Sequence, residues 1–343
     1  MTRNSRARAF AAVLTGGVVV GSFVLASGGD QRPVNGTIWA ANRGSHTIRG
    51  FDADTGAETH TIAMAPASQP GDLAYAKGKL YVTEEFGTPP AIAIVDPEAG
   101  TVVDRIYFPA NSRPHHAHAS ESGNLIAVGL YGTDMVAVVD THDDSLLGPW
   151  DTNPLTTNGR VHAGVFSTDG RTLYVTSDAS NEVIALDPRT GDVHWRMTVP
   201  GAHELAVTHN GKTAYVSRRT ANQLAVIDLE HQTFQDVLGL PLPDSLRLAA
   251  NERLLTVGLR TLPARLAVVD TSTFDAQLVD LAPGEATTLG AHQWTSPSGR
   301  YTFAAFEGGP NPGVAVIDHH AGNVVVQRWS YPGRPHGVDH VLP

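Results

Sequence analysis

An apolar run that ends in aspartate recurs seven times along this 343-residue chain and constrains its fold more than any other feature. Ala137-Val138-Val139-Asp140 is a clear copy. Successive copies lie between 41 residues apart (Asp187 to Asp228) and 48 residues apart (Asp270 to Asp318). A repeat of this length is typical of propeller blades and solenoid units. The aspartates that end the seven runs are Asp52, Asp96, Asp140, Asp187, Asp228, Asp270 and Asp318.

Each period holds four short strand-like stretches and no helical periodicity. Leu173-Tyr174-Val175-Thr176 precedes an aspartate-ended run, and Val193-His194-Trp195-Arg196 follows it. A further stretch runs into a hairpin that contains glycine, such as Gly170. Four strands in about forty residues indicate one propeller blade, because a β-helix has shorter periods and a sandwich has no reason to repeat. The sequence therefore predicts an all-β, seven-bladed propeller over residues 36–343.

The phase of the repeat predicts how the ring closes. The first repeat begins at the second strand of a blade, Thr37-Ile38-Trp39-Ala40, and the chain ends on a lone strand of the first kind near His336. We expect this C-terminal strand to pair with the N-terminal strands, which would complete the seventh blade and leave no open sheet edge.

The first residues have the character of an export signal. Arg3, Arg6 and Arg8 precede an apolar run, and cleavage after Ala26 is expected, with a retained membrane anchor as the alternative. Residues 1–26 are thus interpreted as a signal peptide, 27–35 as a short linker, and the protein as secreted or extracytoplasmic (periplasm or cell-wall space). Loss of three arginines changes the formal net charge from −10 to −13, which argues against nucleic acid or anionic lipid as partner.

Histidines recur at the start of the strands expected to line the central channel. Counting back eight residues from Gly123, Gly170 and Gly211 reaches His115, His162 and His203. Pro335-His336 resembles Val161-His162, and Asp244 stands at the matching place in the next blade. His292 joins the ring if one residue is missing before Gly299, and the first blade gives Pro70. Because inner strands run along the propeller axis, these side chains should meet at one end of the channel.

A ring of imidazoles and a carboxylate predicts a metal site. Zinc prefers three or four such N and O donors, copper and nickel are not excluded, and calcium and magnesium prefer oxygen alone. The chain has no cysteine, so histidine and carboxylates must supply the ligands. The alternative is structural, since a single histidine here could simply bond neighbouring blades. The candidate ligands are His115, His116, His118, His162, His203, His292, His336, Asp244 and Glu204.

Two resemblances carry these residues further. Leu173-Tyr174-Val175-Thr176-Ser177 is similar to the YVTN-type repeats of bacterial propellers, which specifies a fold and not a function. The stretches around His115, His162, His203 and His336 resemble the AztD-type periplasmic zinc metallochaperones. That resemblance implies zinc bound at the propeller centre and passed to the solute-binding protein of an ABC transporter. The metal-poor stretch Gly28–Arg32 departs from the family, which has a histidine-rich segment near its mature start.

The rival function class is an enzyme. A channel metal could activate water or polarise a lactone or ester carbonyl, with Glu204 beside His203 as a base. No Gly-x-Ser-x-Gly nucleophile motif occurs, so we expect a zinc carrier rather than an enzyme. We also expect a monomer that does not associate with a membrane after signal cleavage. A metal-dependent lactonase or lyase, and a metal-free interaction scaffold, are the alternatives.

Overall fold

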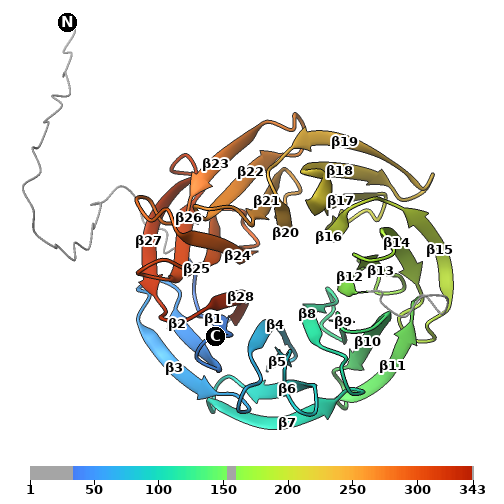
Figure 1. The fold of residues 1–343 in the computed structure, drawn as a ribbon, viewed down its shortest axis with the longest axis horizontal. Helices are drawn as coiled ribbons and strands as arrows, with labels where there is room; N and C mark the ends of the chain where they lie inside the picture. The colour runs from blue at the N-terminus through green and yellow to red at the C-terminus, as the bar shows by residue number, and fades with distance from the viewer. Residues whose placement is uncertain (1–33, 153–159, 342–343) are drawn as a thin grey trace, which may run out of the picture. The chain divides into compact units, whose positions relative to one another are not determined.

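The computed structural model describes residues 34–152 and 160–341, and the predicted signal peptide lies outside them. The strands form seven antiparallel sheets of four, arranged as a ring around a central axis (Figure 1). The region where the innermost strands face this axis is called the channel below. The all-β, seven-bladed prediction is therefore confirmed. One short 3-10 helix, η1 (Arg219–Ala221), accompanies the strands in the described part of the chain, where no helix is long and apolar enough to cross a bilayer.

The innermost strand of each blade lines the channel. In blade order from the closing blade, these strands are β28 (Pro335–Val341), β4 (Pro70–Ala76), β8 (Pro114–Ala119), β12 (Val161–Phe166), β16 (Ala202–Val207), β20 (Pro243–Leu248) and β24 (Thr288–Thr295). The second strands are β1 (Thr37–Asn42), β5 (Lys79–Glu84), β9 (Leu125–Leu130), β13 (Leu173–Ser177), β17 (Thr213–Arg218), β21 (Leu254–Leu259) and β25 (Tyr301–Gly308).

The third strands carry the repeated apolar runs. They are β2 (Thr47–Asp52), β6 (Ala91–Asp96), β10 (Met135–Asp140), β14 (Glu182–Leu186), β18 (Gln223–Asp228), β22 (Arg265–Asp270) and β26 (Gly313–Asp318). The outermost strands are β3 (Glu58–Ala63), β7 (Thr101–Tyr107), β11 (Ser145–Asp151), β15 (Val193–Thr198), β19 (Thr233–Gly239), β23 (Ala276–Asp280) and β27 (Val324–Ser330).

The repeated aspartates form turns, as the sequence suggested. The Asp52 carboxylate accepts hydrogen bonds from the backbone N–H groups of Asp54 and Thr55, and Asp187 does the same for Arg189 and Thr190. Aspartate favours such turns because its short side chain can bond the backbone two or three residues on. Each turn reverses the chain toward the outermost strand, so the aspartates lie at the end of the ring opposite the starts of the inner strands.

The apolar core lies between neighbouring blades. Phe51 in blade one packs in the same buried cluster as Phe303 and Val316 of the adjacent blade. The second and third strands are apolar on both faces, since each sheet is sandwiched between two others, whereas the outermost strands are largely exposed. The core therefore ties each blade to the next around the ring.

The ring closes through β28 and β1, as predicted. Val338 pairs with Ala40 and Asp339 with Trp39 in antiparallel register, so the C-terminal strand becomes the innermost strand of the first blade. This pairing also brings His336 to the same end of the channel as the other inner-strand histidines.

A charge at the closing strand should break the ring. Val338 is 2% exposed and packs in the core cluster, so Val338→Asp should lower the free energy of unfolding by about 3 kcal/mol or more. Val324→Asp on the exposed edge strand β27 is the matched control and should change it by less than about 0.5 kcal/mol. Urea denaturation followed by circular dichroism measures both, and equal midpoints would show that closure contributes little.

Candidate functional site

A β-bulge lies at or near the start of every inner strand and sets the geometry of the channel mouth. In β8, Pro114 pairs with Leu130 and Ala117 with Val128, so this stretch holds one residue more than its partner strand. The same single extra residue recurs in the other six inner strands, for example between Ala202 and Glu204 of β16. A bulge re-aims side chains that regular pleating would bury between sheets. Each blade therefore presents bulge residues to the channel.

The first bulge position carries most of the predicted histidines. His115, His162, His203 and His336 all stand one residue after the first residue of their strand, and Asp244 occupies this place in β20. The His162 and His203 rings are 3.6 Å apart between centroids, and the His115 and His162 rings 4.9 Å. The sequence-based register is thus confirmed for these five blades.

The second bulge position carries a second set of donors. Asp72, His116, Glu204 and His292 stand here, all 0–2% exposed. His292 was assigned to the first position on the assumption of a missing residue. The pairing of Gly290 with Phe306 shows that no residue is missing, so His292 matches His116 in place.

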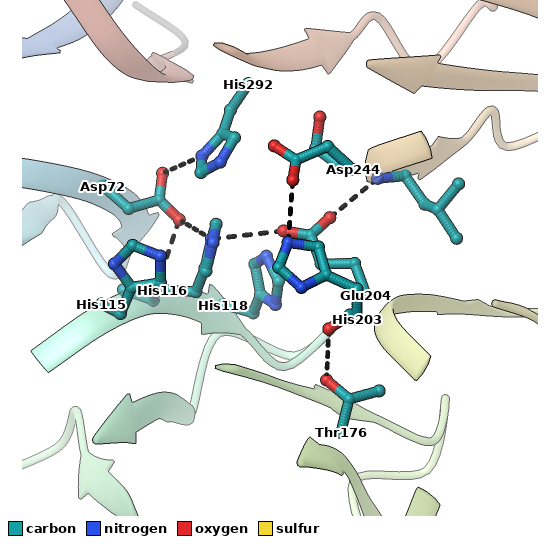
Figure 2. Close-up of polar contacts among 12 residues, drawn as sticks. Asp72, His115, His116, His118, Thr176, His203, Glu204, Asp244 and His292 are labelled. Atoms are coloured by element: carbon teal, nitrogen blue, oxygen red, sulfur yellow. Dashed lines mark hydrogen bonds and ion pairs between the residues drawn. The ribbon is translucent and has the colours of Figure 1, made fainter. Parts of the chain in front are cut away.

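His116 is the centre of this inner cluster (Figure 2). Its Nδ1 lies 3.0 Å from Asp72 Oδ2 and 3.3 Å from Glu204 Oε1. Its ring centroid is 4.3 Å from that of His292 and 4.4 Å from that of His162. Donors from four blades therefore meet around one imidazole.

The inner cluster depends on a close approach between two strands. A Cβ at Gly337 would lie 2.5 Å from Oδ1 of Asp72, so only glycine lets β28 pass this carboxylate. Asp72 is the donor that sequence reasoning missed, because the eight-residue count finds only the first bulge position, which in β4 is Gly71. The hairpin after β4 is also one residue short, so the count from Gly78 reached Pro70. The place of Asp72 two residues after Pro70, like that of His116 after Pro114, was the available signal.

His118 adds a donor to the same side of the cluster. Its Nδ1 lies 3.1 Å from the Gly164 carbonyl oxygen, so a neutral ring donates from Nδ1 and keeps Nε2 as an acceptor. Asp72 holds the His116 ring in the same way, which leaves Nε2 of His116 as the lone-pair atom. Carboxylates and carbonyls orient metal-binding histidines by this kind of hydrogen bond.

His203 and Asp244 differ from the other candidates because they are paired with each other. His203 Nε2 lies 2.8 Å from Asp244 Oδ1, and its Nδ1 lies 3.0 Å from Asp178 Oδ1. Arg219 approaches Asp244 at 3.1 Å. Burial opposes a charged ring, but Asp244 and Asp178 raise the pKa of His203 to about 9. A protonated histidine cannot be a ligand, so metal binding at this ring would first require loss of its proton.

Burial keeps the remaining histidines neutral. It lowers the pKa of His116 and of His118 to about 4, and those of His115, His162, His292 and His336 also lie below the ordinary value. Burial opposes ionisation of Asp72, yet the hydrogen bond from His116 and the His292 ring 4.0 Å away hold its pKa well below the usual range. The cluster thus combines neutral imidazoles with an ionised carboxylate, which are the protonation states that metals bind.

Several buried donor atoms of the cluster have no hydrogen-bond partner among the described residues. Among the ring nitrogens they are His116 Nε2, His118 Nε2, His162 Nδ1, His292 Nδ1 and His336 Nδ1. An unsatisfied buried polar atom costs about 1–3 kcal/mol, and five in one place need an explanation. Unbonded nitrogen lone pairs beside carboxylates have the donor chemistry of a transition-metal site.

Three triads of donor atoms could hold an ion, each with its atoms within 4.8 Å of one another. All three contain His116. They are His115–His116–His162, Asp72–His116–His118 and His116–Glu204–His292. Tetrahedral zinc with bonds of about 2.0–2.2 Å places its ligands roughly 3.3 Å apart, so small rotations would bring a triad onto one ion. Zinc, copper or nickel match this mixed nitrogen and oxygen set, and no ion is identified.

Comparison with known proteins relates the chain to other propellers. A family described as "Lactonase, 7-bladed beta-propeller" matches residues 109–260. Protein YncE of Salmonella typhi, an uncharacterized protein, is 26% identical over 241 residues, which are 65% of this chain and 66% of that protein. Its counterpart in Salmonella typhimurium is 24% identical over 239 residues. The matched family region includes β8, β12, β16 and β20, and so most of the candidate ligands.

Solved structures share the fold. The periplasmic gluconolactonase PpgL of Pseudomonas aeruginosa superposes with a TM-score of 0.68 at 19% identity, covering 90% of this chain and 99% of that one. A functionally unknown protein from Desulfotomaculum acetoxidans gives 0.71 at 10% identity, with 90% and 100% covered. A putative 6-phosphogluconolactonase from Bacteroides fragilis gives 0.63 at 13% identity, with 91% and 100% covered.

These findings correct one expectation. The absence of a nucleophile motif suggested a protein that is not an enzyme, but the match of residues 109–260 to a lactonase family points toward a possible hydrolase. The motif argument was wrong in principle, because metal-assisted hydrolysis needs no serine nucleophile. The narrower resemblance to zinc metallochaperones stays a prediction.

Acid should destabilise the metal-free protein. In the unfolded chain His116 and His118 take protons near pH 6.5, but in the fold only near 4. Above about pH 6.5 both states carry neutral rings, so the free energy of unfolding is unaffected by these histidines. As pH falls from 6.5 toward 4, only the unfolded chain takes up the protons, and the free energy of unfolding should drop by about 2 kcal/mol per histidine by about pH 5. Urea denaturation with a chelator present, at pH values from 7 to 5, measures this. His118→Asn should flatten the slope, and a slope unchanged by that variant would contradict the assignment.

Proposed function

We propose that the protein is an exported zinc carrier, which binds one Zn²⁺ in the cluster around His116 and passes it to a zinc solute-binding protein. The observation that supports this most directly is the set of buried, unpartnered ring nitrogens beside Asp72 and Glu204. Zinc is here the cargo of the protein. Its preference for mixed nitrogen and oxygen ligands matches the donor set.

The arrangement also suits release of the metal. The triads share His116 and lie side by side, so an ion can exchange one set of donors for the next without leaving the cluster. His115 is partly exposed, at 13% of its side chain, stands at the first bulge position, and belongs to the triad with His116 and His162. A route from the inner triads through His115 to the mouth would let an acceptor take over the ligands one by one.

Removing the shared donor should abolish tight zinc binding. His116→Ala takes one ligand from all three triads, so the affinity should fall by at least about a hundredfold. The folded blades should survive, since the interblade cores lie elsewhere. His231→Ala, which removes an exposed turn histidine, is the matched control. Calorimetric zinc titration measures both, and equal affinity in the two variants would refute the site.

Transfer distinguishes a carrier from a mere zinc-binding protein. Zinc-loaded protein should pass metal to a zinc solute-binding protein at a rate that rises with acceptor concentration, because the acceptor attacks the bound ion. Stopped-flow fluorescence with a competing chelator measures it. A rate fixed at spontaneous dissociation, whatever the acceptor concentration, would contradict direct transfer.

A metal-dependent lactonase is the second candidate, favoured by the family match over the strands that carry the donors. Zinc bound here would polarise a lactone carbonyl. Glu204 is held by the Leu246 N–H at 2.7 Å through Oε2 and directs Oε1 toward His116, which suits it to hold a proton beside the metal. Hydrolysis of a panel of lactones by wild-type protein, lost in His116→Ala and retained in His231→Ala, would establish this activity.

A further inference from the structure

The outer edge of the histidine cluster carries more arginine than carboxylate. Arg43 and Arg113 both contact Glu85, each at 2.7 Å. On the adjoining blades, Arg260 and Arg334 both contact Glu307, at 3.2 and 3.0 Å, and the Arg334 carbonyl accepts a hydrogen bond from the Arg43 N–H at 3.0 Å. Four guanidinium groups thus share two carboxylates. Two of the four positive charges are therefore not neutralised by these carboxylates, in a protein whose formal net charge is −10.

Arg43 brings this surplus directly onto the ring. Its Nη2 lies 3.2 Å from Nδ1 of His115, its side chain is only 11% exposed, and its Nε is buried without a hydrogen-bond partner. A Cβ at Gly71 would lie 3.1 Å from Nη2, so the guanidinium occupies the place where other blades project a histidine. One buried guanidinium N–H is therefore available next to the cluster.

The charges of the two layers do not balance once a metal is present. Asp72 and Glu204 would neutralise a divalent ion, while Glu85 and Glu307 neutralise only two of the four arginines. The surplus would oppose entry of a cation, because Arg43 and Arg260 are largely buried, at 11% and 19% exposed, and buried charges are screened less than exposed ones. A small anion between metal and guanidiniums would remove this repulsion, and guanidinium groups bind carboxylates and other oxyanions with directed N–H bonds.

We propose that the mouth of the channel binds a small carboxylate or oxyanion between the arginine layer and the metal cluster, and that anion and metal bind cooperatively. This inference rests on the proposed metal site and adds the class of its co-ligand. In a carrier the anion closes the loaded site, and in a lactonase the same position receives an anionic substituent of the substrate. Cooperativity must be reciprocal, since each ligand changes the affinity of the other by the same factor.

The test uses Co²⁺ as a coloured substitute for zinc, with acetate and sulfate as the two anion probes. In wild-type protein, the affinity for Co²⁺ should rise about tenfold when at least one of the two anions is added. The visible spectrum of the bound Co²⁺ should shift at the same time, because a new ligand enters its coordination shell. Acetate acting alone would indicate an organic carboxylate, and sulfate acting alone or equally would indicate a general oxyanion site. An absence of effect from both anions would overturn the proposal.

Arg113→Gln combined with Arg334→Gln removes the two surplus charges at partly exposed positions. This variant should bind Co²⁺ in anion-free buffer at least as tightly as wild type, but should lose the anion effect. Arg171→Gln with Arg189→Gln, at the opposite end of the ring, is the matched control and should keep it. An anion effect that persists in the first variant would overturn the proposal. If neither wild type nor any of the variants binds Co²⁺ in anion-free buffer, the metal site itself would be refuted.

Discussion

The pairing of β28 with β1 is the constraint on which the channel depends. Seven sheets packed side by side form a closed ring only if the last is joined to the first, and here that joint is made by backbone hydrogen bonds within one sheet. Closure fixes the distance between blades around the axis. It thereby fixes how near His336 comes to His292, with ring centroids 4.2 Å apart, although the two residues belong to different blades.

Within that frame, the site is made by a local irregularity repeated seven times. A regular strand alternates its side chains between two faces, and both faces of an inner strand contact neighbouring blades. The extra residue at the start of each strand breaks this alternation and directs consecutive side chains toward the axis. Blade three therefore contributes both His115 and His116. One kind of bulge therefore supplies metal-binding donors at two levels along the channel axis, from the first and the second bulge positions.

Much of this architecture was predictable from the sequence. The period of the aspartate-ended runs and the phase at the two ends predicted seven blades and the closing pair. Equal hairpin lengths predicted the register of His115, His162 and His203. Asp72 was not found because the count from the hairpin glycine locates only the first bulge position, which in this blade is Gly71. The pairing of His203 with Asp178 was also beyond reach, since it joins an inner strand to the loop after β13 of another blade, and their approach depends on packing rather than on periodicity.

The turn-forming aspartates have a consequence for how the molecule moves toward other charged bodies. They concentrate negative charge at the end of the ring where the third strands finish, while Arg43, Arg113 and Arg334 stand at the end where the inner strands begin. The protein is thus an electric dipole directed along its own channel. Near an acidic surface, the protein would rotate until the channel mouth faces that surface, so it would be oriented before contact is made. This alignment weakens as salt concentration rises, because salt shortens the range of the field.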